Sequence, residues 1–455
     1  MEQSVEQFDF VIIGAGSAGE AAAQLACRRG ATVAVVERDL FGGSCPFWAC
    51  MPSKTLLHGA SIHHLGGDYP WSQASDRRDY MINREGSDYP DDAGHVKSLE
   101  KAGAVAIRGE ARIVGPGRVE VHDGRLRTLQ GRSLIVAVGS HSRIPPIEGL
   151  DADDIWTNRQ GTATRELPRS LVILGGGPTG VELAQIYARY GVPTTIIDSN
   201  ERLLSRDHPR NSAAVTEALE KDGVTVLTGV RAVRLQQGVG ADGARSVELS
   251  DGSRVEGHET LVAVGRAFPL DALGLESIDV QVDDKGGVQP DERLRIAPDV
   301  YLVGDPAGPE MHTHLAHYQG EMAVRIALGE DVQPDYRAIP RATYTDPETA
   351  SVGLRLDEAL EAGHDALEET QNLAETAKGY VAEASGHVTV VVDRRDRVLL
   401  GAFICGPGAS EAIHEAVLAI KLRVPLAVLA DTIHAFPTVS RVMGSLFAKV
   451  ARDLE

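Results

Sequence analysis

Two segments of the chain repeat the same order of elements, and this repeat is what most restricts the fold. Each has a short apolar run, three spaced glycines, a segment of residues that favour a helix, and a second apolar run that ends in an acidic residue. The first copy has Gly14, Gly16, Gly19 and Glu37, and the second has Gly175, Gly177, Gly180 and Asp198. Glycine lets the backbone approach a pyrophosphate, whose charge then faces a helix N-terminus. Each copy therefore predicts one bound dinucleotide.

The secondary structure expected around these glycines is the same in both copies. A lone glycine triplet would be weak evidence for a dinucleotide site, because glycines occur in turns of every kind. Two copies, each preceded by a predicted strand and followed by a predicted helix, are specific evidence. The predicted strands and helix are 8–13, 18–27 and 32–36 in the first copy, and 171–174, 181–190 and 194–197 in the second.

Length and charge exclude several classes of function. A chain of 455 residues should form about three domains. Its net charge of −20 argues against a nucleic-acid partner, because such proteins concentrate positive charge on one face. No apolar run reaches the roughly 18 residues of a membrane span, and the start is acidic, unlike a signal peptide. We expect a cytoplasmic protein without membrane insertion that acts on a small molecule.

The remaining sequence completes an α/β chain with a different C-terminal part. Residues 69–93 read as a polar excursion with a short helix, and 119–139 as antiparallel strands. A helix is expected over 315–328. From about Arg341 strands and helices mix in an α+β pattern, with strands at 388–392 and 398–404 and helices at 409–422 and 439–454.

Two of the four cysteines are close together. Cys27 and Cys405 lie in apolar surroundings and read as buried small side chains. Cys45 and Cys50 are five residues apart, about 7.5 Å along an ideal helix, slightly beyond the reach of a disulfide. Pro46 and the preceding glycines make an irregular helix start plausible, and a helix N-terminus lowers a thiol pKa. A redox pair and two structural thiols both remain open; no zinc spacing is present, so no metal is expected.

The segment 42–54, GGSCPFWACMPSK, resembles the signature of the pyridine nucleotide-disulfide oxidoreductases, which include dihydrolipoyl dehydrogenase, glutathione reductase and mercuric reductase. The likeness continues at 137–140, 303–305 and 345–347, and so covers essentially the whole chain. It implies two doubly wound Rossmann-like dinucleotide-binding domains plus a C-terminal α+β dimerisation domain. The expected parts are an FAD-binding domain (1–150), an NAD(P)-binding domain (151–285), a central segment completing the FAD domain (286–336) and the dimerisation domain (337–455).

The resemblance also implies roles for individual residues around a redox-active disulfide. Cys50 would face the flavin as the charge-transfer thiolate, and Cys45 would exchange with a substrate. Lys54 would lie near the flavin N5 and pair with Glu182, although on the residues alone both could be solvated surface charges.

Further flavin contacts are expected from three other positions. Asp305 would bind the ribityl chain, and Gly139 would line the FAD site. The helix from Leu315 would direct its positive end at the flavin, with His314 beside it; the alternative for His314 is a polar helix cap.

One segment departs from the family. Its disulfide reductases carry H-P-x-x-x-E, where the histidine is a base from the partner subunit; here the segment runs from Phe436 to Arg441 as FPTVSR. A phenyl ring takes no proton, and a base is typically worth 10²- to 10⁴-fold, so disulfide exchange should be slow. His434 is a possible substitute or a bystander. An appended metal-binding domain and a C-terminal cysteine pair are missing, so mercury is not the expected substrate.

The sequence thus predicts a homodimeric FAD enzyme that passes electrons from NAD(P)H to an acceptor. A quinone or diaphorase-type acceptor is favoured because flavin reduction needs none of the missing groups. The alternatives are a dihydrolipoyl dehydrogenase or related disulfide reductase, and a non-enzymatic flavin and thiol redox sensor. NADH is favoured over NADPH because Asp198 would repel a 2′-phosphate, although Arg202 lies near enough to weaken that preference.

Overall fold

The computed structural model describes residues 5–238 and 241–455 and divides the chain into two units. The first unit consists of Met1–Thr55, Ser75–Arg143 and Gly265–Asp335. The second consists of Leu56–Ala74, Ile144–Val264 and Tyr336–Glu455. The two glycine repeats fall in different units, so the second nucleotide-binding region is inserted into the sequence of the first.

The first unit is built on a twisted sheet with the strand order β16-β17-β6-β1-β2-β3. From β17 to β3 neighbouring strands are parallel, and the last four residues of both β1 and β6 are apolar or small and buried, as expected of a parallel sheet covered on both faces. The bounds are β1 (Val5–Ile13), β2 (Val33–Glu37), β3 (Val105–Arg108), β6 (Leu126–Val136), β16 (Arg295–Ala297) and β17 (Val300–Leu302). The antiparallel strands β4 (Glu110–Gly115) and β5 (Arg118–His122) extend β6 where antiparallel pairing was predicted.

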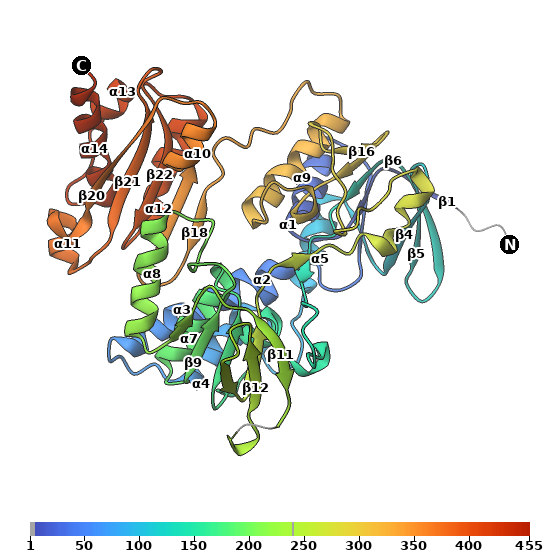
Figure 1. Cartoon of the computed structure of the whole chain (residues 1–455). Helices are drawn as coiled ribbons and strands as arrows, with labels where there is room; N and C mark the ends of the chain where they lie inside the picture. Colours follow the sequence, from blue (N-terminus) through green and yellow to red (C-terminus); the bar gives the residue numbers. More distant parts are fainter. Residues whose placement is uncertain (1–4, 239–240) are drawn as a thin grey trace. The chain divides into compact units, whose positions relative to one another are not determined.

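Helices α1 (Ser17–Arg28) and α9 (Thr313–Ala327) pack side by side in this unit, as Figure 1 shows. Their contact is close because both helices present small residues. A Cβ atom added to Gly320 would lie 2.1 Å from the carbonyl oxygen of Ala18. The predicted helix over 315–328 is therefore confirmed as α9, and the carbonyl oxygen of its first residue, Thr313, accepts a hydrogen bond from Ser17 at the start of α1.

The nucleotide-binding part of the second unit has a smaller parallel sheet with the order β10-β9-β8-β14. A three-stranded antiparallel sheet, β11-β12-β13, accompanies it. The bounds are β8 (Leu171–Leu174), α7 (Pro178–Arg189), β9 (Thr194–Ile197), α8 (Pro209–Lys221), β10 (Thr225–Leu227), β11 (Ala232–Gln236), β12 (Arg245–Leu249), β13 (Arg254–Gly257) and β14 (Glu259–Val262). With the first unit, this confirms two Rossmann-like regions.

The C-terminal part is a five-stranded antiparallel sheet, β18-β19-β22-β21-β20. One core lies between this sheet and helices α12 and α14, and a smaller core includes side chains of α10. The bounds are β18 (Arg341–Thr343), β19 (Thr349–Gly353), α10 (Leu356–Glu361), β20 (Ala366–Asn372), β21 (His387–Asp393), β22 (Val398–Cys405), α12 (Ala409–Lys421), α13 (Leu426–Ala430) and α14 (Val439–Asp453). The predicted α+β domain is present.

The polar excursion contains one helix, α4 (Trp71–Met81), and leads to α5 (Ala93–Ala102). Within this polar stretch Arg78 is fully buried. The Arg78 Nε donates to Asp79 Oδ1 at 2.7 Å, and Arg84 Nη2 donates to the same oxygen at 2.5 Å. Buried charges persist where they are paired in this way. Over the portion of the chain that the structure describes, every helix is too short or too polar to span a bilayer.

Candidate functional site

The first glycine turn joins β1 to α1 and needs glycine for steric reasons. Gly14 has φ 101°, and a Cβ atom there would lie 2.3 Å from the Ala137 carbonyl oxygen. A Cβ on Gly19 would lie 1.9 Å from the Gly14 carbonyl oxygen. A Cβ on Gly43 would come within 2.7 Å of the Gly16 Cα. The backbone is thus packed as tightly as a pyrophosphate cradle requires, which fits the residues to FAD.

Glu37 closes this turn from the end of β2. Its Oε2 accepts a hydrogen bond from the Ala15 N–H at 2.8 Å, and its Oε1 accepts one from the Asp39 N–H at 2.8 Å. Burial raises the pKa of this carboxyl, and the two N–H donors oppose the shift. The carboxylate therefore positions the glycine turn from within the protein, while its predicted contact with a ribose remains a prediction.

A polar chain lies near the C-terminal ends of the same sheet. Arg266 Nε donates to Ser140 Oγ, which in turn donates to Asp305, and Arg266 Nη2 donates to the Ser140 carbonyl oxygen at 2.8 Å. Gly139 has φ 60° and open space where a Cβ would stand. Asp305 is thus held in place by partners that sequence reasoning missed, since Arg266 is 126 positions from Ser140. These groups could hold the FAD sugar chain.

Both cysteines lie near the junction of two consecutive helices. Helix α2 (Ser44–Trp48) ends before Ala49, whose φ of −136° and ψ of −96° break the helix, and α3 (Cys50–His64) starts at once. Gly42 and Gly43 have left-handed backbone angles, φ 102° and 71°. The predicted irregularity is therefore present, and the structure has Cys45 and Cys50 as thiols.

The start of α9 contacts this cysteine pair. Thr313 Oγ1 lies 3.5 Å from Cys50 Sγ, and the Thr313 carbonyl oxygen accepts from Ser17 Oγ at 3.1 Å. The pKa of the Cys45 thiol is raised, first by its hydrogen bond with Cys50, then by burial and by the charge of Cys50; Thr313 and Lys54 oppose the shift. For Cys45 this is the opposite of the lowering expected at a helix N-terminus. The direction favours a proton on Cys45.

Other predicted redox-site residues are found in both units. Lys54 Nζ donates to Ser53 Oγ at 3.4 Å in the first unit. In the second, Glu182 is buried and its Oε1 accepts from the Tyr344 N–H at 3.0 Å. Because the two residues belong to different units, their pairing stays a prediction.

His314 is exposed in the first turn of α9. Its ring stacks on that of His312, with centroids 5.0 Å apart and planes 11° apart. His312 Nε2 lies 2.8 Å from Glu310 Oε2, so this neighbour is held by an acid. The sequence indicated the helix terminus but not the stacked pair.

The second glycine turn, between β8 and α7, repeats the first almost atom for atom. Gly175 has φ 107°, and a Cβ on Gly180 would lie 2.0 Å from the Gly175 carbonyl oxygen. Asp198 Oδ2 accepts from the Gly176 N–H at 2.6 Å, and its Oδ1 accepts from the Asn200 N–H at 2.7 Å. A Cβ on Gly177 would meet open space, so this turn too could receive a pyrophosphate.

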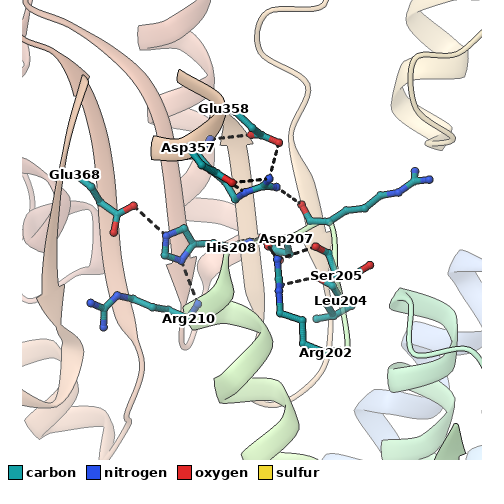
Figure 2. Close-up of polar contacts among 11 residues, drawn as sticks. Arg202, Leu204, Ser205, Asp207, His208, Arg210, Asp357, Glu358 and Glu368 are labelled. Atoms are coloured by element: carbon teal, nitrogen blue, oxygen red, sulfur yellow. Dashed lines mark hydrogen bonds and ion pairs between the residues drawn. The ribbon is translucent and has the colours of Figure 1, made fainter. Parts of the chain in front are cut away.

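Arg202 forms its hydrogen bonds within the loop that follows β9. Its guanidinium donates to the carbonyl oxygens of Leu204, Ser205 and Asp207 in its own loop, as Figure 2 shows. Arg202 was expected to weaken the preference for NADH because of its place in the sequence; its side chain instead donates within its own loop, and the preference itself stays a prediction.

In the C-terminal segment that departs from the family, Phe436 is exposed and His434 is buried at its side chain. Phe436 is 74% exposed, and Arg441 is also exposed. The His434 side chain is only 5% exposed; its Nε2 lies 2.6 Å from Glu415 Oε1 and its ring packs against Gly444. This environment favours a structural role for His434 over that of a base. Within residues 5–238 and 241–455 no cluster of acids, histidines and cysteines is suited to a metal ion.

Family models match both parts of the chain: pyridine nucleotide-disulphide oxidoreductase over residues 8–320, and the dimerisation domain of the same family over 339–446. The chain belongs to this family. It is an NAD(P)H-dependent flavoprotein oxidoreductase, FAD and NAD(P)H are the family's cofactors, and the C-terminal match supports a homodimer.

Relatives and solved structures agree along the whole length. The chain is 34% identical to a dihydrolipoyl dehydrogenase of Thermus scotoductus, with 96% of each chain covered. It is 29% identical to a mercuric reductase of Staphylococcus aureus, over 95% of this chain and 80% of that one. Its fold is similar to LpdA from Mycobacterium tuberculosis, with 27% identity, a TM-score of 0.88, and 98% and 100% of the chains covered. It is also similar to the HOCl-induced flavoprotein disulfide reductase RclA of Escherichia coli, with 25% identity, a TM-score of 0.86, and 97% and 100% covered.

Proposed function

We propose that this enzyme uses NADH to reduce a planar, non-disulfide acceptor of the quinone type. The observation that carries the proposal is the exposed phenyl ring of Phe436, which stands where the family's disulfide reductases have a base. A phenyl ring neither accepts nor donates a proton, but it offers an apolar face to an aromatic acceptor. The exposed cation of Arg441 replaces the acid that would orient a base.

The side chains have distinct tasks in this reaction. When bound, FAD supplies two-electron chemistry between reduced nicotinamide and the acceptor. The two glycine turns and their acids, Glu37 and Asp198, would hold the dinucleotides. Asp305, oriented by Ser140, would bind the flavin sugar chain. Cys50, with Thr313 beside it, would carry negative charge next to the redox centre, while Cys45 keeps its proton.

NADH is the proposed reductant for two reasons. The carboxylate of Asp198 would accept hydrogen bonds from ribose hydroxyls and repel a 2′-phosphate. Arg202, the nearest cation in sequence, is engaged by backbone carbonyls and so offers little to such a phosphate.

Steady-state turnover of the purified holoenzyme with NADH tests the acceptor. We expect kcat/KM for a soluble benzoquinone to exceed that for lipoamide or glutathione disulfide by about 10²-fold or more, the range attributed to a lost base. Efficient lipoamide turnover by the unaltered enzyme would reverse the ranking.

Restoring the base sharpens this test. The double change Phe436→His with Arg441→Glu should raise disulfide turnover by roughly 10-fold or more, because it returns a proton acceptor with an orienting acid. Phe436→Leu is the matched control, since it keeps an apolar side chain and should leave disulfide turnover low. Equal gains in both variants would show that the base is not what limits this reaction.

A disulfide reductase remains the second candidate because the cysteine pair is intact and Thr313 contacts it. Cys45→Ser separates the two: quinone reduction should persist if the acceptor reacts at the flavin, and should disappear if electrons must pass through the thiols. If no acceptor turns over while the thiols respond reversibly to redox potential, the redox-sensor alternative is favoured.

A further inference from the structure

Arg202 is the centre of a hydrogen-bond network in the loop that follows β9. Its Nη1 donates to the Leu204 carbonyl oxygen at 3.2 Å, and its Nη2 donates to those of Ser205 at 2.7 Å and Asp207 at 2.9 Å (Figure 2). A guanidinium has five N–H donors and no acceptor, so three bonds to carbonyls use most of its capacity. The side chain is half-buried, and burial lowers its pKa.

This loop rests directly on the second glycine turn. The Leu204 N–H donates to the Gly176 carbonyl oxygen at 2.8 Å. A Cβ on Gly176 would lie 2.3 Å from Leu203 Cδ2, so the leucine side chain touches the turn. Leu204 itself has φ 48°, a left-handed conformation that costs free energy for a residue with a branched side chain. The carbonyl bonds of Arg202 hold the loop in this conformation.

The same contacts reach the acid of the nucleotide site. The Gly176 N–H donates to Asp198 Oδ2 at 2.6 Å, and its carbonyl oxygen accepts from Leu204. Gly176 therefore links the two: its N–H contacts the Asp198 carboxylate, and its carbonyl oxygen is held by the loop that contains Arg202. A change in that loop is expected to alter the direction of the carboxylate.

The far end of the loop is braced by the C-terminal domain within the second unit. Arg355 Nη1 donates to the Arg206 carbonyl oxygen at 3.1 Å. His208 Nε2 lies 3.2 Å from Glu368 Oε2, while its Nδ1 accepts from the Arg210 N–H at 3.2 Å (Figure 2). The loop is thus held at both ends, and Arg202 donates to three of its carbonyl oxygens. Ser212 Oγ also donates to the Leu203 carbonyl oxygen, at 2.6 Å, so Arg202 shares the task of holding the loop.

We propose that Arg202 is a positioning residue that determines nucleotide specificity: it fixes loop 199–208 so that Asp198 stays directed at the ribose, and it does not bind a 2′-phosphate. The inference rests on the proposed function of this site as the NADH site. Loss of the guanidinium removes charge-assisted bonds from three carbonyls. The carboxylate then loses its fixed direction, which weakens its bonds to the ribose hydroxyls of NADH and its repulsion of NADPH.

Anaerobic flavin reduction by NADH and by NADPH, followed by stopped flow on the holoenzyme, tests the proposal. Arg202→Ala should raise Kd for NADH about tenfold, leave the limiting rate of flavin reduction unchanged, and lower the preference for NADH over NADPH by a similar factor. A phosphate-binding role predicts the reverse, with weaker NADPH binding and an increased preference for NADH. That result, or an unchanged preference, would overturn the proposal.

Two further variants distinguish an effect of loop position from an effect of lost positive charge. Arg206→Ala removes an equal charge from the same loop; its side chain is exposed and, within the described ranges, forms no side-chain hydrogen bond or ion pair. It should keep the wild-type preference, and a loss equal to that of Arg202→Ala would refute a positioning role. Arg355→Ala withdraws the brace outside the loop and should lower the preference about two- to threefold.

Folding and function are checked in the same experiment. Flavin content and Tm show whether each variant folds. If Arg202→Ala does not fold, Arg202→Lys decides, because a lysine keeps the charge but cannot serve three carbonyls from one planar group. Its preference for NADH must fall, and an unchanged preference overturns the proposal. A wild-type flavin that neither nucleotide reduces would instead refute the proposed function, independently of Arg202.

Discussion

The two glycine turns of the molecule are nearly superposable in their contacts but lead to different surroundings. In each, the acid at the end of the second strand accepts from an N–H of the turn: Glu37 from Ala15, and Asp198 from Gly176. In each, the third glycine packs on the carbonyl oxygen of the first, at 1.9 and 2.0 Å for an added Cβ. The two turns thus share the same arrangement of glycines and acid.

The difference begins directly after the acid. In the first unit, the chain leads through Gly42 and Gly43 into the cysteine helices. In the second, it leads into the loop of Arg202 and on to contacts with the C-terminal domain. The turn itself therefore fixes where a dinucleotide binds, and the segment after the acid determines what that dinucleotide meets. Three pairs of substitutions test this division.

The largest effect is expected from valine at the third glycine of either turn. Gly19→Val and Gly180→Val would each drive a side chain into a backbone carbonyl that cannot move aside, and overpacking of this kind costs about 1–3 kcal/mol. Gly19→Val should lose FAD on gel filtration. Gly180→Val should remain yellow while Kd for NADH rises roughly 10- to 100-fold. If Gly180→Val also lost its flavin, the two units would not bind their cofactors independently.

A smaller effect is expected when each acid is replaced by its amide. Asp198→Asn and Glu37→Gln each place an NH2 group against a backbone N–H donor, at a cost of about 1–3 kcal/mol. Burial raises the pKa of Glu37 and so already penalises its charge; the neutral side chain recovers part of that cost. We expect about a tenfold rise in Kd for NADH in Asp198→Asn, and a smaller loss of FAD affinity in Glu37→Gln, by fluorescence titration. A larger loss in Glu37→Gln would contradict this order.

The smallest effect concerns Thr313, which contacts the thiols in the first unit only. Because the pKa of Cys45 is raised, its thiolate is scarce near neutral pH, and alkylation of the reduced protein should accelerate as pH rises beyond the ordinary thiol value of about 8.5. Thr313→Val removes a hydrogen bond that lowers this pKa, so alkylation at pH 8.5 should slow by about two- to fivefold.

Mass spectrometry of iodoacetamide-treated protein measures this rate at each cysteine. Thr313→Ser keeps the hydroxyl and should behave like the wild type. Cys405 provides an internal reference, since it is fully buried and should remain unlabelled in the folded protein. Faster alkylation of Cys45 in Thr313→Val would show that the threonine does not stabilise the thiolate.

The sequence predicted best what depends on local spacing. Both glycine turns, the acids after them and an irregular helix around Cys45 and Cys50 follow from residues fewer than 25 positions apart. Thr313 beside Cys50, by contrast, depends on tertiary packing between segments 263 positions apart. The contacts of Arg202 could not be predicted for a related reason: its proximity in sequence to Asp198 suggested an influence on nucleotide preference, whereas the fold of the loop turns the guanidinium onto carbonyl oxygens of that loop. The pKa of Cys45 is raised rather than lowered because its hydrogen bond with Cys50 outweighs the lowering expected at a helix N-terminus.

The insertion of the second nucleotide region has a consequence for biosynthesis. Strand β6 pairs with β17 in the register Leu134 to Val300, a separation of 166 positions. At a ribosomal rate of roughly 5–20 residues per second, β17 is synthesised about 8 to 33 s after β6, and this edge of β6 stays unpaired for that time. During that interval the nascent sheet has an open apolar edge of the kind that promotes pairing with other chains. Retention of flavin by the nascent chain should therefore lag well behind synthesis of its first glycine turn.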